Sequence, residues 1–565
     1  MRLRTLVCAL VCGAAVFGQQ AWQAKEFPIG CWRGPSPAHN TLEHYQRVRD
    51  CNFNIVGPSG GYTPESHRTL LDLAAKAGLK AILVDGRISS QMVMRDDWKS
   101  LVTQIVADYA SHPALYGYYL HDEPSSVLFD PLGKISREFE RQDPTHLPYI
   151  NLLPTYANNR QLGTPTYADH LQKFLQISTP RVISYDHYAL LKKGGVRADY
   201  YENMELVQVA SQRSGIPWWY VHNSGAYSGY RVPTEAEMRW QVYTSLAYGT
   251  KGIGYWYYWG RLQEDDDRTG VVDRDGKPTR LYHILQKLNG ETQALGKVLL
   301  PLTWTGAWHV GEIPQGTRRL GGDGIVQLPA DKPLFVGLFR AADGTQYAMI
   351  VNRDYAAPVE FEAGFLPHVV GVARISAKDG SAAALTSKTR TFTLGLGAGD
   401  GMLLRLTTEF DYPKPPKTLT AIDFQFNQRG DMEGWGGLAG LSAEKVAGGT
   451  LTMALGAQDP HISRSYLRVP AGTYQGLRVR MRVTSGMAQG QVFWTTSAEP
   501  AFSAMRHVNF PTVPDGTWQE YEIPLGKHAR WAGQEIRGIR LDPSVGEAKP
   551  GATVEIDWIA GIPAE

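Results

Sequence analysis

Two neighbouring carboxylic acids stand at the end of a short apolar and aromatic segment. Residues 115–120 read Leu-Tyr-Gly-Tyr-Tyr-Leu, and His121, Asp122, Glu123 and Pro124 follow them. Such a run is typical of a buried β-strand. Carboxylates at the carboxyl end of a barrel strand usually do chemistry rather than stabilise the fold. A carboxyl group flanked by aromatic rings keeps its proton to higher pH, so Glu123 is the best candidate for a general acid.

Strand geometry predicts where these acids point. Alternation puts Glu123 on the same side as His121 and Tyr119, and Asp122 on the opposite side. Both carboxylates reach one site only if the strand ends before Asp122. In the alternative interpretation, Asp122 or Glu123 caps the helix that follows Pro124.

Asp186, His187 and Tyr188 form a second polar cluster, after the apolar residues 182–185. Asp186 is a candidate second catalytic carboxylate, and His187 or Tyr188 would orient it. The alternative is a structural ion pair between Asp186 and Arg33 or Arg87.

The elements that position these residues alternate between short apolar runs and amphipathic segments. The apolar runs cover 27–32, 54–58, 81–85, 115–123, 149–153, 182–188, 218–223 and 253–259. Eight strands alternating with helices over roughly 250 residues predict a (β/α)₈ TIM barrel, here residues 25–300. The competing doubly wound sheet would prefer a Gly-rich phosphate loop after its first strand, and residues 31–35 do not form one.

In such a barrel the carboxyl ends of all strands meet at one site. The predicted catalytic residues are Glu123, Asp186 and Asp122. The predicted substrate-binding residues are Trp32, Arg33, Asp85, His121, His187, Tyr188, His222, Asn223, Trp256 and Trp259. Trp256 and Trp259 would stack on a sugar ring or, equally well, pack in the barrel core. The sequence has no zinc motif, nucleophile elbow or phosphate loop, so no metal and no required cofactor is predicted there.

After the barrel, short strands and turn signals predict two all-β sandwich domains. Residues 301–410 predict an antiparallel sandwich, 411–419 a Pro-rich linker, and 420–565 a jelly roll. Some of the jelly-roll tryptophans would form a sugar-binding face, and most would fill the core. Asp423 and Asp557 are candidate ligands of a structural Ca²⁺ ion.

The N-terminus predicts export. Arg2 and Arg4 precede an apolar segment, residues 5–17, that is too short to span a bilayer, so residues 1–24 are interpreted as a signal peptide of a secreted or periplasmic protein. Candidate cleavage positions follow Gly18, Ala21 and Ala24. No later segment has the length of a membrane span.

Two cysteines, Cys31 and Cys51, remain after removal of the signal. A pair in an exported protein suggests a disulfide. However, Cys31 would end the first strand at the top of the barrel and Cys51 the first helix at its bottom. That separation exceeds the ~7 Å limit on the Cα distance, so we expect no disulfide.

Composition narrows the class of partner. The net charge of +2 does not favour a nucleic acid or an anionic membrane. Aromatic residues make up 11%, with 15 Trp and 28 Tyr, which fits a protein that handles sugar rings, although β-rich cores explain part of this content. We therefore expect a carbohydrate as the partner.

At these positions the chain resembles the clan A glycoside hydrolases, (β/α)₈ retaining enzymes that include the β-galactosidases. In that clan the fourth strand ends in Asn-Glu-Pro with Glu as acid/base, and residues 122–124, Asp-Glu-Pro, stand in that place. Residues 186–188 are similar to the sixth-strand His-x-Tyr element, and Trp256 or Trp259 matches a Trp that lies under the sugar. The resemblance covers residues 27–300, and the trailing domains are similar to accessory and carbohydrate-binding modules.

One departure from the clan pattern decides how much of its mechanism carries over. Clan A places a nucleophilic Glu at the end of the seventh strand, but residues 217–224 read Pro-Trp-Trp-Tyr-Val-His-Asn-Ser. Three interpretations follow. Glu123 is the acid with Asp186 as base or nucleophile; or Asp122 or Glu123 attacks and Asp186 protonates, as in α-galactosidase-like barrels; or the barrel is an inactive carbohydrate-binding scaffold.

Overall fold

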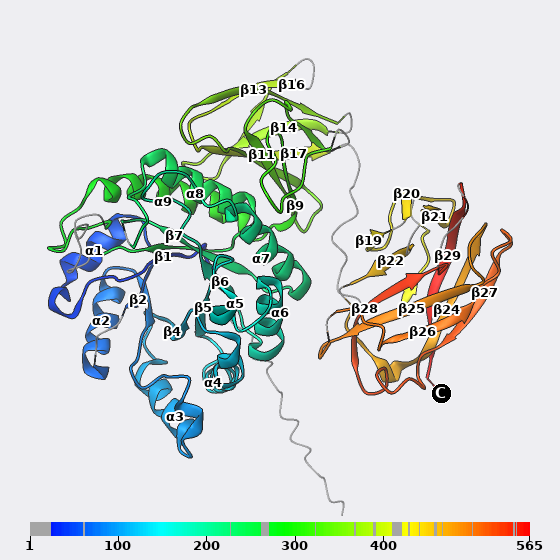
Figure 1. The fold of residues 1–565 in the computed structure, drawn as a ribbon, viewed down its shortest axis with the longest axis horizontal. Coiled ribbons are helices and arrows are strands. Elements are labelled where there is room, and N and C mark those ends of the chain that lie inside the picture. The colour runs from blue at the N-terminus through cyan, green and yellow to red at the C-terminus, as the bar shows by residue number, and fades with distance from the viewer. Residues whose placement is uncertain are drawn as a thin grey trace, which may run out of the picture. The chain divides into compact units, whose positions relative to one another are not determined.

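The computed structural model describes residues 24–564 except 60–62, 227, 261–269, 322–323, 367–368, 388–390, 409–420, 428–429, 440, 457–459, 466, 500, 546–548 and 550. The chain forms a closed barrel followed by antiparallel sheets (Figure 1). The predicted fold class, a TIM barrel with all-β sandwiches, is confirmed. The predicted linker and the signal peptide up to residue 23 lie outside the described residues.

Eight strands in chain order close the barrel, and β8 pairs with β1 in parallel, with Cys31 opposite Tyr255. The strands are β1 Ile29–Cys31, β2 Ile55–Ser59, β3 Lys80–Leu83, β4 Leu115–Asp122, β5 Leu147–Leu152, β6 Ile183–Asp186, β7 Trp218–Asn223 and β8 Ile253–Trp256. Every residue of β5 and β7 is buried, as expected for parallel strands covered on both faces.

Helices follow the barrel strands, and side chains cap the first turns of α2, α5, α6 and α8. The helices are α1 Leu42–Asp50, α2 Pro64–Lys76, α3 Trp98–Tyr109, α4 Phe129–Gln142, α5 Asn159–Leu162, α6 Tyr167–Ser178, α7 Tyr200–Ser214, α8 Glu235–Ala247 and α9 Arg280–Leu299, with 3₁₀ turns η1 Pro37–His39, η2 Met92–Met94 and η3 Ser126–Leu128. A further 3₁₀ turn, η4 Ala471–Thr473, belongs to the C-terminal domain. Thr63 and Ser66 cap α2 reciprocally, and Thr234 and Glu237 cap α8 in the same way.

The next domain is an antiparallel sandwich that packs on α8. One sheet has the order β10-β13-β16 and the other β15-β14-β17-β12-β11-β9. The strands are β9 Thr303–His309, β10 Val326–Gln327, β11 Leu334–Arg340, β12 Gln346–Asn352, β13 Val359–Phe365, β14 Val369–Ile375, β15 Ala382–Leu385, β16 Thr391–Leu396 and β17 Gly401–Thr408. Arg239 of α8 binds Glu291 of α9 and Asp400 beside β17, each at 2.8 Å.

The C-terminal domain is a second sandwich, with sheets β20-β21-β29-β24-β27 and β19-β22-β28-β25-β26; β18 pairs with β29 and β23 with β28. The strands are β18 Asp423–Phe424, β19 Trp435–Ala439, β20 Leu441–Ala447, β21 Thr450–Leu455, β22 His461–Arg464, β23 Val469–Pro470, β24 Tyr474–Val483, β25 Gln489–Thr496, β26 His507–Pro511, β27 Gln519–Pro524, β28 Glu535–Asp542 and β29 Thr553–Pro563. Trp435, Trp494 and Trp531 are buried in its core.

The predicted calcium ligands of the C-terminal domain have other partners. Asp557 accepts a hydrogen bond of 2.7 Å from Arg480, and Asp423 accepts one of 2.6 Å from Gln425. Within the described ranges, no group of three or more His, Cys, Asp or Glu side chains is arranged to hold a metal ion.

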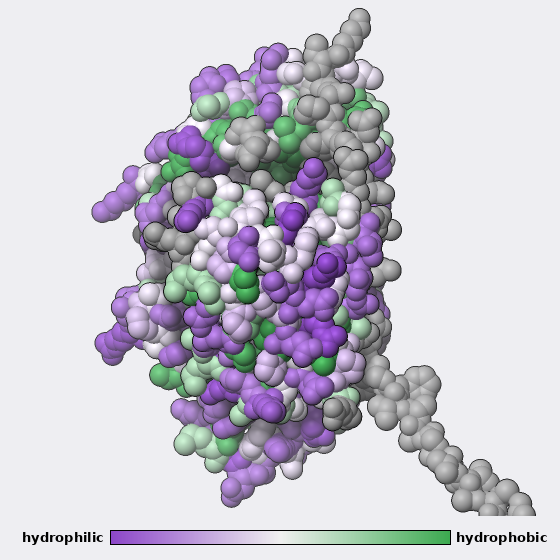
Figure 2. Space-filling view, turned by 90° about the vertical axis from the view of Figure 1, so that its right-hand side faces the viewer, coloured by the Kyte–Doolittle hydropathy of each residue, from purple (hydrophilic) through white to green (hydrophobic). Residues whose placement is uncertain are grey.

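The two cysteines are free and buried, as predicted. The Cys51 thiol donates to the carbonyl oxygen of Tyr282 at 3.4 Å. Among the residues that the structure describes, no helix combines the length and the apolar character that a membrane span requires. Hydrophilic and hydrophobic residues are interspersed over the face in Figure 2, which is an ordinary pattern for a protein surface.

The contact between β11 and α8 depends on a glycine. A Cβ atom at Gly337 would lie 1.8 Å from the carbonyl oxygen of Ala247, and backbone cannot move aside as a flexible side chain can. Gly337→Ala should therefore destabilise this unit by about 3 kcal/mol, measured by calorimetry. Gly472→Ala is the control, because no atom lies within 4 Å of its added Cβ. Equal melting temperatures for the two variants would show that the contact is not tight.

Candidate active site

A β-bulge in β4 sets the direction of Asp122. In the pairing of β4 with β5, Tyr119 lies opposite Tyr149 and Asp122 lies opposite Asn151, so three steps on β4 match two on β5. The register shift falls at Leu120. A bulge of this kind reverses the alternation beyond it, so Asp122 lies on the same face as Tyr119. The prediction that Asp122 points away from Tyr119 was therefore wrong.

Asp122 lies against neutral polar side chains. The Asn151 amide donates to Asp122 Oδ1 at 3.4 Å, and the Tyr119 hydroxyl lies on the same side and acts to lower the pKa of Asp122. Burial of the carboxyl group raises its pKa, while these two interactions and the neighbouring His121 act in the opposite direction. The side chain nevertheless reaches solvent. Asp122 is thus an acid that protein surrounds on most sides but that remains accessible.

Glu123 turns back toward the same site. Its φ of 44° lies in the left-handed region, and its amide donates to the Asn151 carbonyl oxygen at 2.8 Å. Non-glycine residues rarely adopt this conformation, which costs of order 1–3 kcal/mol and is concentrated at functional sites. The turn brings the Glu123 carboxyl group beside Asp186, and this interaction acts to lower the pKa of Glu123.

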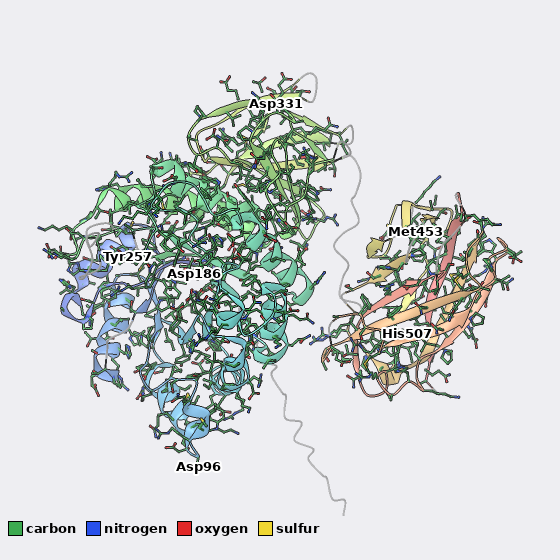
Figure 3. All side chains as sticks on the ribbon, viewed as in Figure 1. Asp96, Asp186, Tyr257, Asp331, Met453 and His507 are labelled. Carbon is green, nitrogen blue, oxygen red and sulfur yellow. The ribbon has the colours of Figure 1, made fainter. Side chains whose placement is uncertain are left out.

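The Glu123–Asp186 contact joins the ends of β4 and β6. Burial raises the pKa of Glu123, the charge of Asp122 raises it further, and the interaction with Asp186 partly offsets both effects. Two neighbouring carboxyl groups repel each other when both are ionised, which favours a proton on one of them. Asp186 is 7% exposed and lies among the barrel strands in Figure 3. Its contact with Glu123 brings two of the predicted catalytic residues together.

Four aromatic rings form a cluster in which Trp32 packs against the other three. The Trp32 ring lies 5.6 Å from Tyr119, 6.2 Å from Tyr149 and 5.9 Å from Trp256, between ring centroids. Trp256 is partly exposed, and the Arg33 guanidinium lies 6.0 Å from its ring centroid. Trp256 is therefore the ring that a ligand can reach.

Four other residues predicted to bind substrate have protein contacts of their own. His121 Nδ1 lies 2.6 Å from the Asp122 carbonyl oxygen. His187 is buried with its ring centroid 5.0 Å from Tyr156. Two further predicted residues have these contacts: Asn223 Oδ1 accepts from the Gly225 amide at 3.4 Å, and the Tyr188 ring lies 5.4 Å from Tyr230.

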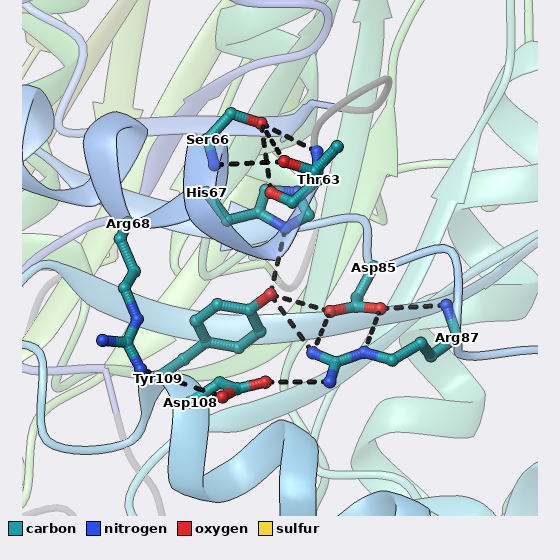
Figure 4. A network of polar contacts seen from close by, with 8 residues as sticks. All are labelled: Thr63, Ser66, His67, Arg68, Asp85, Arg87, Asp108 and Tyr109. Atoms are coloured by element: carbon teal, nitrogen blue, oxygen red, sulfur yellow. Dashed lines mark hydrogen bonds and ion pairs between the residues drawn. The ribbon is translucent and has the colours of Figure 1, made fainter.

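Asp85 is bound by other side chains of the protein. Arg87 binds it through Nε at 3.0 Å and Nη2 at 2.7 Å, and the Tyr109 hydroxyl donates to it at 2.8 Å (Figure 4). Burial acts to raise the pKa of Asp85, but these hydrogen bonds outweigh it and the pKa is lowered. Arg87 also binds Asp108 at 2.8 Å. The observed partners of Asp85 are thus protein side chains, and its predicted contact with a substrate stays a prediction.

His222 and Trp259 also have structural partners. His222 is fully buried and its Nε2 lies 3.2 Å from Ser245 Oγ of α8; burial lowers its pKa to about 3. Trp259 packs against the rings of His39 and His44 and donates to the Arg274 carbonyl oxygen at 3.0 Å. These polar atoms contact a helix and a loop, and the predicted substrate contacts of both residues stay predictions.

Two residues of the site were missed by the sequence analysis. Tyr149 Oη lies 2.6 Å from Ser184 Oγ, and Ser184 donates to Asn151 Oδ1 at 2.9 Å. The signal was available, because Ser184 precedes Asp186 by two strand positions and Tyr149 precedes Asn151 by two, so each pair shares a face.

No protein-family model matches the sequence, and comparison with curated proteins gives no match. Among solved structures, the chain is similar to β-galactosidase from Bacillus circulans sp. alkalophilus, with 9% identity, 68% of this chain and 99% of that chain covered, and a TM-score of 0.48. The chain is also similar to the isomalto-dextranase of Arthrobacter globiformis T6, with 12% identity, 94% of this chain and 96% of that chain covered, and a TM-score of 0.42.

A third similar structure is β-galactosidase from the psychrophilic Marinomonas ef1, at 12% identity and a TM-score of 0.39. The similarity covers 49% of this chain and 62% of that chain, so this chain spans less than two thirds of that protein. At these identities the likeness to glycoside hydrolase structures is one of fold.

Asp85 provides a test of its structural assignment. Asp85→Asn should lower the free energy of unfolding by about 2 kcal/mol at pH 7, because hydrogen bonds to an ionised group are lost. The lowered pKa of Asp85 means that its contribution is present above the unfolded-state pKa and disappears as pH falls through the folded-state value. The difference between variant and wild type, measured by calorimetry, should therefore vanish in acid.

The exposed Arg95–Asp97 pair supplies the control for that measurement. Asp97→Asn should change the melting temperature little at any pH, because surface pairs contribute little. An Asp85→Asn variant as stable as Asp97→Asn at pH 7 would contradict the structural role.

Glu123 should behave in the opposite sense. Its raised pKa means that folding disfavours the ionised form, so the cost appears as pH rises through the unfolded-state pKa and persists above the folded-state value. Glu123→Gln should therefore melt at a higher temperature than wild type at pH 8, with no difference at pH 4. Glu138→Gln should melt lower at pH 8, because the hydrogen bond from Arg141 lowers the pKa of Glu138. The same sign for both variants would refute the assignment.

Proposed function

We propose that this chain is an exported glycoside hydrolase that cleaves O-glycosidic bonds in a plant, algal or microbial polysaccharide or oligosaccharide. The supporting observation is that Glu123, whose pKa is raised, lies beside Asp186, while a third acid, Asp122, accepts a separate hydrogen bond from Asn151. Glycoside hydrolysis requires one carboxylic acid that donates a proton and a second carboxylate that stays ionised. The three side chains supply both at the carboxyl ends of two barrel strands.

In the proposed reaction the Glu123–Asp186 pair protonates the glycosidic oxygen as the bond to the anomeric carbon breaks. The electron pair of that bond leaves with the oxygen, and positive charge develops at the anomeric carbon. Asp122 stabilises this charge or attacks the carbon directly, and water completes the hydrolysis. Positioned proton transfer of this kind contributes about 10²–10⁴-fold to rate.

The contact between Glu123 and Asp186 bears on the choice among the mechanisms that the sequence leaves open. Carboxyl groups that act on opposite sides of a sugar are about 5–5.5 Å apart in retaining enzymes and about 6.5–9.5 Å apart in inverting enzymes. Glu123 interacts directly with Asp186, which favours a shared role over positions on opposite sides of a sugar. We therefore propose that the pair acts as one proton donor and that Asp122 is the opposing carboxylate.

The remaining parts of the chain fit this proposal. Trp256 offers a partly exposed ring on which the sugar can stack. We propose that the C-terminal sandwich binds carbohydrate and that residues 1–24 direct export. The reaction needs no cofactor, and any Ca²⁺ bound through Asp423 in the C-terminal domain would be structural.

Two kinds of substrate distinguish the proton donor, Asp186 with Glu123, from the opposing carboxylate, Asp122. Asp186→Asn should lower kcat/KM on polysaccharides by about 10²–10⁴-fold, because the leaving oxygen loses its proton donor. The same variant should lose much less activity on 2,4-dinitrophenyl glycosides, whose leaving group departs without protonation. Asp122→Asn should lower kcat/KM on both, and Asp97→Asn, an exposed control, on neither.

Equal losses for Asp186→Asn on both kinds of substrate would contradict its role as proton donor. If the wild type binds a glycan from a broad panel but cleaves none, the chain is an inactive carbohydrate-binding scaffold, the second candidate function.

A further inference from the structure

A chain of hydrogen bonds runs along the inner face of the barrel and ends on Asp122. Tyr149 Oη lies 2.6 Å from Ser184 Oγ, Ser184 Oγ donates to Asn151 Oδ1 at 2.9 Å, and Asn151 Nδ2 donates to Asp122 Oδ1 at 3.4 Å. The residues come from β5, β6 and β4. Tyr149, Ser184 and Asn151 are each at most 2% exposed, so water does not replace these partners.

With the Asn151 amide as it lies, each proton in this chain has one direction. The single hydroxyl hydrogen of Ser184 goes to Asn151 Oδ1, because an amide oxygen can only accept. Tyr149 must therefore donate to Ser184. From Tyr149 onward, every donor points toward Asp122, a carboxylate that, when ionised, only accepts.

The direction of the chain is coupled to the state of Asp122. If the Asn151 amide turned over, its oxygen would face Asp122 Oδ1, and the two acceptors would repel unless Asp122 held a proton. After this turn the Ser184 hydroxyl would lose its acceptor on Asn151, and it would have to reverse and donate to Tyr149 instead. The interaction with Tyr119 also acts to lower the pKa of Asp122. The network thus favours the ionised carboxylate.

We propose that Tyr149 and Ser184 are positioning residues that hold the Asn151 amide in the orientation that keeps Asp122 ionised. The catalytic meaning of this assignment rests on the proposed function, whereas the hydrogen-bond order does not. The titratable groups that face Asp122 or share its network are Tyr119 and His121 of β4, Glu123, Tyr149 of β5 and Asp186 of β6.

The test measures the protonation of Asp122 without a substrate. Infrared difference spectra between wild type and Asp122→Asn, recorded across pH, isolate the carbonyl band of protonated Asp122 and its titration midpoint. Ser184→Ala, measured against Ser184→Ala/Asp122→Asn, should raise that midpoint by about one pH unit, since one hydrogen bond to a charged group is lost. Tyr149→Phe should shift it in the same direction, which keeps the test decisive if one variant does not fold.

Tyr118→Phe is the matched control, because the Tyr118 hydroxyl is buried in the same strand pair but donates to Asp143 at 2.7 Å. It should leave the midpoint unchanged. An unchanged midpoint in Ser184→Ala and Tyr149→Phe, or an equal shift in Tyr118→Phe, would overturn the assignment.

A kinetic measurement separates this inference from the proposed function. On any glycan that the wild type cleaves, the acid limb of kcat/KM against pH should move upward in Ser184→Ala by the same amount as the infrared midpoint. A shifted midpoint with no glycan cleaved by the wild type would support the hydrogen-bond order and reject the hydrolase. A shifted midpoint with an unshifted acid limb would overturn the positioning role.

Discussion

Direct contact between two carboxyl groups, Glu123 and Asp186, governs the chemistry available to this barrel. Two such groups in contact hold a proton at a pH at which an isolated carboxyl group would have lost it. In the proposed reaction that proton makes the pair the acid. Asp122, which accepts a hydrogen bond from Asn151, is then the carboxylate that opposes it.

Two local departures from regular strand geometry make this contact possible. The bulge at Leu120 turns Asp122 to the inner face of the barrel, and the left-handed backbone of Glu123 returns the next side chain to the same site. A regular strand would direct consecutive residues to opposite faces. Strain in β4 and at its end is thus the structural condition under which two consecutive acids serve one site.

The sequence was sufficient to predict the barrel and its strand ends. Eight apolar runs separated by amphipathic segments carry the periodicity of alternating strands and helices. The run 218–223 coincides with β7, whereas the runs 115–123 and 182–188 extend one and two residues beyond the ends of β4 and β6. The bulge at Leu120 was not predictable, because it arises from the pairing of β4 with β5 and not from the residues of β4 alone.

The partners of Asp85 and His222 were not predictable for a similar reason. Asp85 is bound by Tyr109, which lies 24 positions away on α3, and no local pattern reports that partner. His222 lies on a strand that is buried on both faces, where apolar character does not distinguish the barrel interior from the helix layer. Because β7 ends at Asn223 instead of an acid, the proposed reaction relies on the acids at the ends of β4 and β6.

The most direct measurement is a neutron crystal structure of the protein in deuterated buffer near pH 6. The account predicts one deuterium between the carboxyl oxygens of Glu123 and Asp186, none on Asp122, and an Asn151 amide whose deuterium points to Asp122. A deuterium on Asp122, or Glu123 and Asp186 both ionised and separated, would contradict it.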